Sequence, residues 1–95
     1  MSVKVVVQFK ALENRQEDFQ VLMRSVSKDL PGVAGCRGVE VLQDREDACR
    51  FTLVETWDSV EIHKSHIDGL VADGTWAAIS GHLAEDPVSG YFRSL

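Results

Sequence analysis

The chain has 95 residues, of which 44% are hydrophobic and 26% are charged, and its formal net charge is −5 at pH 7. These values are typical of one globular domain, placed at residues 1–95, and the negative charge argues against nucleic acid or anionic lipid as the main partner. No apolar run has the length of a signal-peptide core or a membrane span, so we expect a cytoplasmic protein.

The first part of the chain predicts a strand followed by a helix. Residues 3–9 alternate between apolar and polar side chains, which is typical of a strand with one buried face. Asn14 and Glu17 have the spacing of a capping box, which predicts the start of a helix that Pro31 ends. The apolar positions of this helix form one stripe facing a core: Leu12, Phe19, Leu22, Met23, Val26 and Leu30.

The second part of the chain predicts a hairpin, two helices and a last strand. The expected elements, in order, are strand 36–43, turn 44–47, strand 50–57, a helix after Asp58, a short helix at 76–80 and strand 87–92. Asp58 and Glu61 again have capping-box spacing, so we expect Asp58 to cap the second helix. The Asp-Gly-Thr sequence at residues 73–75 is expected to start the short helix.

The two cysteines, Cys36 and Cys49, are too few for a disulfide framework. If the hairpin turns at residues 43–46, Cys36 faces Leu53, and the two sulfurs lie about four strand residues apart, roughly 13 Å. This distance exceeds the reach of a disulfide, so we expect two reduced, structural cysteines.

The order of the elements predicts a ferredoxin-like split βαβ fold of the α+β class. Its antiparallel four-stranded sheet carries both helices on one face. Apolar side chains on the other face would have no helix to cover them: Val6, Val39, Val41, Thr52 and Val54. A sheet with such an uncovered apolar face usually finds a partner, so we expect a homodimer packed sheet to sheet.

Glu55 is the unusual residue of strand 50–57, because the alternation places it on the face that carries Phe51, Leu53 and Trp57. In a structural interpretation, this carboxylate binds a backbone amide or an arginine such as Arg37 or Arg93. In a functional interpretation, it orients an imidazole that takes a proton from a substrate. The pattern leaves both interpretations open.

Two histidines, His63 and His66, share one face of the second helix because they are three residues apart. His63 falls near the middle of the apolar stripe, where a histidine is usually a packed core residue. His66 lies at the edge of the stripe, from which it can reach into a cleft, so it is the favoured candidate for chemistry. Trp76 could belong to the core or to a pocket wall.

The sequence carries no strong cofactor motif. His63, His66 and Glu55 have the ligand types of a two-histidine, one-carboxylate iron site, but an HxxH pair is common by chance and we expect no metal. No nicotinamide, flavin or haem motif is recognisable, so redox chemistry would proceed without a bound organic cofactor.

Two segments, PGVAGCRGVEVLQD and RFTLVETWDSVEIHKSH, resemble the antibiotic biosynthesis monooxygenase family. The second contains an E-x-W motif at Glu55 and Trp57, with His66 nine residues after the tryptophan. This resemblance extends over nearly the whole chain and implies a dimeric α+β barrel. Many members carry a second histidine about five residues after the first, where this chain has Val71.

Members of the family that resemble this chain include cofactor-free oxygenases of polyphenols, haem-degrading enzymes and an isomerase of a phosphorylated autoinducer. The haem-degrading members have their catalytic tryptophan where this chain has His66, and their haem-ligating histidine where it has Trp76. Haem degradation is therefore not expected. The chain resembles quinol monooxygenase-like members, which implies a small aromatic substrate and oxygen as partners.

The resemblance implies a cofactor-independent monooxygenase that oxidises a hydroquinone or polyphenol. His66 would be the base, Glu55 would orient it, and Trp57, His63 and Trp76 would contact the substrate. Two alternatives remain open. An isomerase of a small hydroxy-carbonyl metabolite could use the same histidine as a proton shuttle, and a non-catalytic dimer could bind a ligand without turnover.

Overall fold

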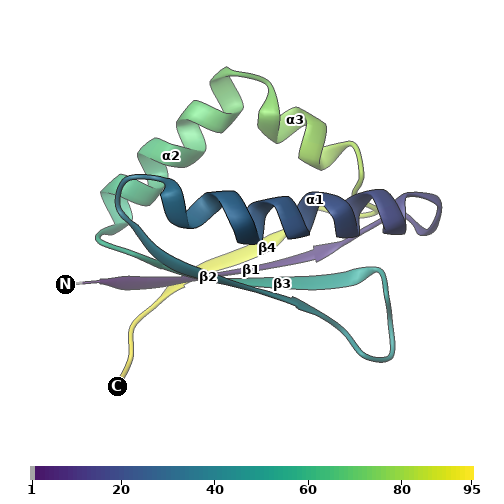
Figure 1. The fold of residues 1–95 in the computed structure, drawn as a ribbon, viewed down its shortest axis with the longest axis horizontal. Helices are drawn as coiled ribbons and strands as arrows, with labels where there is room; N and C mark the ends of the chain where they lie inside the picture. Colours follow the sequence, from purple (N-terminus) through teal and green to yellow (C-terminus); the bar gives the residue numbers. More distant parts are fainter. Residues whose placement is uncertain (1) are drawn as a thin grey trace.

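The computed structural model describes residues 2–95, which form a four-stranded antiparallel sheet with helices on one face. The elements are β1 (Val3–Lys10), η1 (Glu13–Arg15), α1 (Gln16–Asp29), η2 (Leu30–Gly32), β2 (Cys36–Gln43), β3 (Arg50–Trp57), α2 (Val60–Ala72), α3 (Thr75–Ser80) and β4 (Val88–Phe92). The strand order is β2-β3-β1-β4. The predicted ferredoxin-like α+β fold is therefore confirmed, with α1, α2 and α3 all on the same side of the sheet (Figure 1).

The core lies between this face of the sheet and α1. Phe19 of α1 is fully buried and packs edge-on against Phe9 of β1 and Phe51 of β3, at ring-centroid distances of 5.4 and 5.1 Å. After the exposed Arg50, strand β3 alternates between buried and half-buried residues, as the sequence predicted. Within residues 2–95, no helix has the length and apolar character needed to cross a membrane.

Both capping-box predictions are wrong in detail. Asn14 lies inside the 3₁₀ turn η1, and α1 begins two residues later, without a side-chain cap. At α2 the N-cap is Ser59, whose hydroxyl accepts the Ile62 N–H at 3.2 Å. Asp58 forms an ion pair with Arg37 instead, which is a partner that local helix rules do not consider. The short helix α3 starts as expected, since the Asp73 carboxylate accepts the Thr75 N–H.

A β-bulge near the start of β2 reverses part of the predicted pattern. Cys36 pairs with Trp57 and Gly38 pairs with Thr56, so one extra residue is inserted on β2. A shift of one residue moves every later side chain to the opposite face. Val39 and Val41 therefore pack against the core under the helices, and their predicted place on the uncovered face is wrong.

The uncovered face of the sheet is defined here by the residues that the strand registers place opposite the helices. These are Lys4, Val6, Gln8, Lys10, Gly38, Glu40, Leu42, Arg50, Thr52, Val54, Thr56, Val88, Gly90 and Phe92. Val6, Thr52 and Val54 lie there as predicted. Leu42, Val88 and Phe92 are exposed, so the face keeps an apolar character despite the loss of two valines.

The hairpin between β2 and β3 is longer than predicted. Gln43 pairs with Phe51, and the loop spans residues 44–49, so Cys36 lies opposite Trp57 rather than Leu53. The Asp44 carboxylate accepts the backbone N–H groups of Glu46 and Asp47, which stabilises this wider turn. Both cysteines are free and buried, as predicted.

Candidate active site

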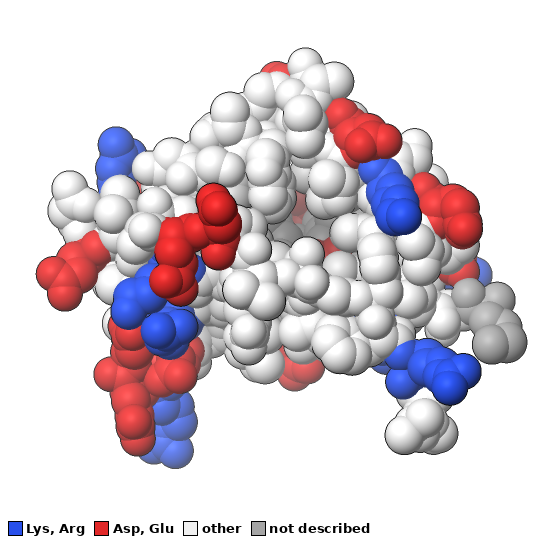
Figure 2. All heavy atoms as spheres, turned by 180° about the vertical axis from the view of Figure 1, so that it is seen from behind, with Lys and Arg blue, Asp and Glu red and all other residues white. Residues whose placement is uncertain are grey.

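A cavity of about 600 Å³ lies between the helices and the sheet. Its wall is mainly apolar and comes from β1, β3, β4 and all three helices, and it includes Trp76 of α3. Figure 2 shows a hollow near the centre of this face of the molecule, with acidic atoms visible inside it. The volume falls in the range of small-molecule sites, about 300–1,000 Å³.

Four polar side chains meet at one part of the cavity wall: Glu55, His63, His66 and Tyr91. The sheet register explains why two of them are neighbours. Val5 of β1 pairs with Glu55 on one side and with Tyr91 on the other, so these residues share a row on the helix-covered face. The two histidines reach this row from α2, because positions three residues apart lie on one side of a helix.

Glu55 and His63 form the buried part of this cluster, with 5% and 7% of their surface exposed. The indole N–H of Trp57 donates to Glu55 Oε1 at 2.6 Å. The same oxygen lies 3.9 Å from His63 Nε2, and His63 Nδ1 lies 2.8 Å from the Tyr91 hydroxyl oxygen. A series of side-chain contacts therefore links Trp57 through Glu55 and His63 to Tyr91.

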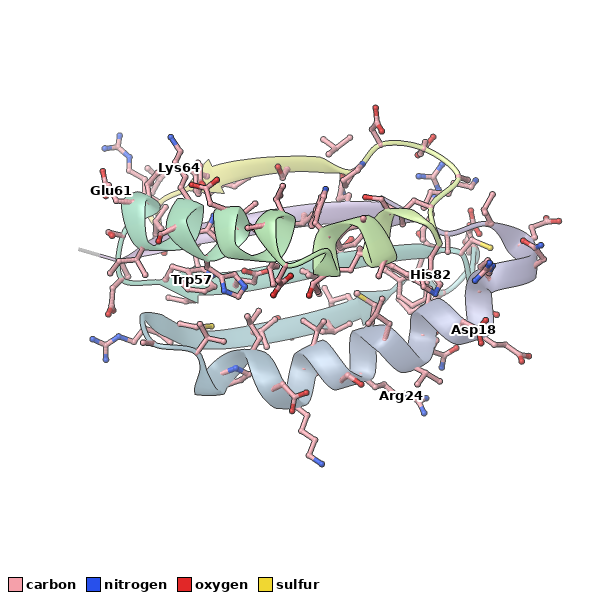
Figure 3. The ribbon with its side chains drawn as sticks, turned by 90° about the horizontal axis from the view of Figure 1, so that it is seen from above. Asp18, Arg24, Trp57, Glu61, Lys64 and His82 are labelled. Atoms are coloured by element: carbon pink, nitrogen blue, oxygen red, sulfur yellow. The ribbon has the colours of Figure 1, made fainter. Side chains whose placement is uncertain are left out.

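Trp57 lies behind the cavity wall and does not line it. Its side chain is fully buried, and its ring contacts both imidazoles, with centroids 5.3 Å from His63 and 5.0 Å from His66. Figure 3 shows Trp57 beneath α2, while Glu61 and Lys64 project from the other side of that helix. Trp57 thus holds the two histidines and Glu55 in place, rather than forming the pocket wall predicted from sequence.

Burial shifts the pKa values of the cluster. It raises the pKa of Glu55, and the hydrogen bond from Trp57 partly opposes this rise. It lowers the pKa of His63, with a smaller contribution from His66, and it also lowers the pKa of His66. Both imidazoles are therefore neutral at pH 7 and able to accept a proton. Burial and nearby carboxylates raise the pKa of Tyr91, which stays protonated.

The structure brings the predicted residues together in an altered arrangement. Glu55 does contact an imidazole, but it is that of His63, the histidine that the sequence placed in the core. Neither suggested arginine binds Glu55, since its hydrogen-bond donor is Trp57 and Arg37 pairs with Asp58. His66 lines the cavity from its edge, as expected for a residue on the border of the helix stripe.

Tyr91 is the site residue that the sequence analysis missed. The signal was present, because Val88 and Phe92 on one face of the last strand put residue 91 on the opposite, helix-covered face. Val71, at the position of the second family histidine, is 58% exposed and does not line the cavity. Among residues 2–95, no three His, Cys, Asp or Glu side chains are placed to hold a metal ion.

Residues 2–69 match the family model described as antibiotic biosynthesis monooxygenase. The chain belongs to this family. The matched residues of this family member include Glu55 and both cavity histidines, whereas Tyr91 lies after the matched segment. A comparison with curated proteins finds no match.

Solved structures share the fold of this family member. A crystal structure of an antibiotic biosynthesis monooxygenase superposes with a TM-score of 0.85 at 16% identity, covering 98% of each chain. A conserved protein from Methanosarcina mazei has a TM-score of 0.84 at 19% identity, covering 100% of this chain and 94% of its own. A candidate antibiotic biosynthesis monooxygenase from Nitrosomonas europaea has a TM-score of 0.83 at 19% identity, covering 99% and 90%. Identities this low support the shared fold only.

Proposed function

We propose that this chain is a cofactor-independent monooxygenase that oxidises a hydroquinone or polyphenol with molecular oxygen. The observation that carries the proposal is the apolar cavity with its four convergent polar groups. An apolar wall accepts a flat aromatic ring, while the polar groups can contact its hydroxyls. Membership of the family supports monooxygenase-like chemistry.

His66 is the proposed base. It lines the cavity, burial keeps its imidazole neutral, and within residues 2–95 its ring makes no hydrogen bond to another side chain. A neutral, unengaged imidazole beside a bound phenol can take the hydroxyl proton. The mainly apolar wall would orient the substrate and limit its contact with water.

The resulting phenolate is electron-rich enough to reduce oxygen directly. Electron transfer and recombination form a carbon–oxygen bond, giving a peroxide on the ring, and the oxygen–oxygen bond then breaks. One oxygen atom stays in the quinone product. The other leaves as water with two hydrogens from the substrate, and the substrate supplies all the electrons.

In this proposal Glu55 acts through His63 rather than through His66. The carboxylate lies 3.9 Å from His63 Nε2 and is itself held by Trp57, so it fixes the His63 ring. Trp57 contacts both imidazoles and gives them a common support. Trp76 would contact the substrate as part of the cavity wall.

The test is oxygen uptake by the purified protein with a panel of dihydroxynaphthalenes and anthrones, after removal of metals and flavin. We expect stoichiometric oxygen consumption with at least one of these substrates and one product oxygen derived from labelled O₂. A requirement for added flavin or metal would contradict the proposal. The same assay without protein corrects for autoxidation.

An isomerase of a small hydroxy-carbonyl metabolite is the second candidate, because two neutral imidazoles face one cavity and could move a proton between adjacent carbons. Such an enzyme would consume no oxygen and would exchange substrate hydrogens with solvent. A non-catalytic binder is less well supported, since Trp57 leaves the cavity unfilled and polar groups converge on it.

A further inference from the structure

We infer that Tyr91 selects the reduced, hydroxylated substrate over its quinone, because its oxygen faces the cavity as a hydrogen-bond acceptor. The inference deepens the proposed function and rests on it, since it concerns the same cavity and substrate class. It starts from one contact, the 2.8 Å between His63 Nδ1 and the Tyr91 hydroxyl. A hydrogen bond at this distance can run in either direction, and the groups around it decide which.

The first step is the position of the proton on His63. Glu55 accepts the indole N–H of Trp57 at 2.6 Å, a bond that favours the ionised carboxylate and opposes the rise in pKa that burial causes. An ionised carboxylate can only accept, and its Oε1 lies 3.9 Å from His63 Nε2. The proton of the neutral imidazole is therefore favoured on Nε2, where it faces the negative charge. The opposite tautomer would turn a lone pair toward that charge.

The second step is the direction of the bond to Tyr91. With its proton on Nε2, His63 has a bare Nδ1 that can only accept, so Tyr91 donates its hydroxyl proton to it. Tyrosine has a single hydroxyl proton. The remaining lone pair of Tyr91 is left for the cavity, which this side chain lines.

The third step is what such an oxygen recognises. The hydroxyl of a hydroquinone or polyphenol can donate a hydrogen bond to it. A quinone carbonyl has no proton to donate. Its oxygen and the Tyr91 oxygen would both be acceptors, and neither would gain a hydrogen bond from the other. Sites built to bind a substrate hydroxyl discriminate against analogues that lack it. Tyr91 would therefore favour binding of the reduced substrate and release of the oxidised product.

The test is equilibrium binding by calorimetry without oxygen, so that no turnover occurs. The ligands are naphthohydroquinone, its dimethyl ether and naphthoquinone. We expect the native protein to bind naphthohydroquinone about 3–10-fold more tightly than the dimethyl ether, which is what one neutral hydrogen bond contributes. Tyr91→Phe should lose most of this preference while its affinity for the dimethyl ether stays within about twofold, which also shows that the variant is folded.

Ser80→Ala is the control. It removes a hydroxyl from α3, the helix that carries Trp76, but Ser80 is exposed and does not line the cavity. We expect this variant to keep the native preference. A preference that survives in Tyr91→Phe, or a native protein that binds the dimethyl ether or the quinone at least as well as the hydroquinone, would overturn the inference. Failure of all three ligands to bind would overturn it as well.

A second measurement examines the bond direction without any ligand. Nitrogen NMR of His63 should show the proton on Nε2 and not on Nδ1, and the reverse result would overturn the inference. Oxygen uptake separates this inference from the proposed function. If the binding preference depends on Tyr91 but no oxygen is consumed, the inference is supported and the proposed oxygenase function is contradicted. If oxygen is consumed but the preference does not depend on Tyr91, the proposed function is supported and the inference is overturned.

Discussion

The two histidines of α2 differ in burial and in their partners, so we expect His66 substitutions to affect turnover and His63 substitutions to affect stability. His66→Ala should reduce turnover by about 10²–10⁴-fold, the usual contribution of general acid–base catalysis. Its free energy of unfolding should fall by no more than about 1 kcal/mol, since a half-buried residue at the cavity edge leaves little new void. Turnover and denaturant melts of the same preparation measure both. Full turnover per folded molecule in this variant would remove the proposed base.

His63→Ala is the counterpart, and it should mainly affect stability. His63 is 7% exposed, packs edge-on against Trp57 and bonds Tyr91, so its removal leaves a cavity and an unpartnered hydroxyl. We expect the free energy of unfolding to fall by about 2–4 kcal/mol. A denaturant melt with an unchanged m-value would check this, and a loss below about 0.5 kcal/mol would contradict the packing described for this ring.

The lowered histidine pKa values also make stability depend on pH. An unfolded histidine binds its proton near the ordinary pKa of 6.5, whereas folded His63 and His66 bind theirs only at lower pH. Below pH 6.5 the unfolded state therefore holds more protons, and the free energy of unfolding falls until the folded pKa values are passed. Glu55 acts in the opposite sense, because its pKa is raised and its protonation stabilises the folded state in acid.

Melts between about pH 8 and pH 5 should thus show the histidine contribution to stability declining below pH 6.5. His66→Gln removes one of the two titrating groups and should flatten the decline. The Glu55 contribution is present in both proteins and cancels in the comparison. An equal slope for the two proteins would show that burial does not shift the His66 pKa.

At the scale of elements, the loop before β2 fixes the start of α2, and Gly35 is the contact point. Gly35 has φ +90°, and a Cβ at this position would collide with the Ile62 side chain of α2. Its carbonyl also accepts the Asp58 N–H, which ties the loop to the end of β3. The helix turn that carries His63 is therefore positioned by a residue distant from it in sequence.

Gly35→Ala should lower the free energy of unfolding by about 1–3 kcal/mol, because it combines an unfavourable backbone conformation with a steric clash. Gly32→Ala is the matched control. It has no positive φ, and nothing lies within 4 Å of its added Cβ, so we expect a change within about 0.5 kcal/mol. Thermal or denaturant melts of both variants measure the difference, and equal stabilities would contradict the proposed contact.

At the scale of the molecule, the uncovered face of the sheet predicts a homodimer. This face carries Val6, Val54 and the exposed Leu42, Val88 and Phe92, with no helix over it. Burying such a surface against a second copy would remove apolar area from water. Sedimentation at micromolar concentration should therefore give twice the 10.5 kDa mass of one chain.

Val54→Glu places a charge in the middle of that face and should shift the protein to the monomer. Val21→Glu is the matched control, because Val21 is 65% exposed on α1, on the other side of the sheet. We expect this variant to sediment like the native protein. A native monomer at micromolar concentration would contradict the dimer, and so would an unchanged mass for Val54→Glu.

Local patterns in the sequence were sufficient to predict the element order, the fold and the inward orientation of Glu55. Alternation on β3 and the apolar stripe of α1 depend on neighbours within one element, and these periods determine which side faces the core. The edge position of His66 follows from the same rule. The free state of both cysteines was predicted from their number and from their separation in the hairpin, although the register used for that separation was wrong.

What only the tertiary structure decided depends on contacts between distant segments. The bulge that turns Val39 and Val41 inward arises from pairing with β3, and the partner of Asp58 is 21 residues away on β2. The assignment of Glu55 to His63 required the position of α2 over the sheet. Tyr91 joins them across 28 residues because β4 returns beside β1, and no local period encodes that return. The site is formed where β3, α2 and β4 meet, so its geometry is set by tertiary packing and not by any one element.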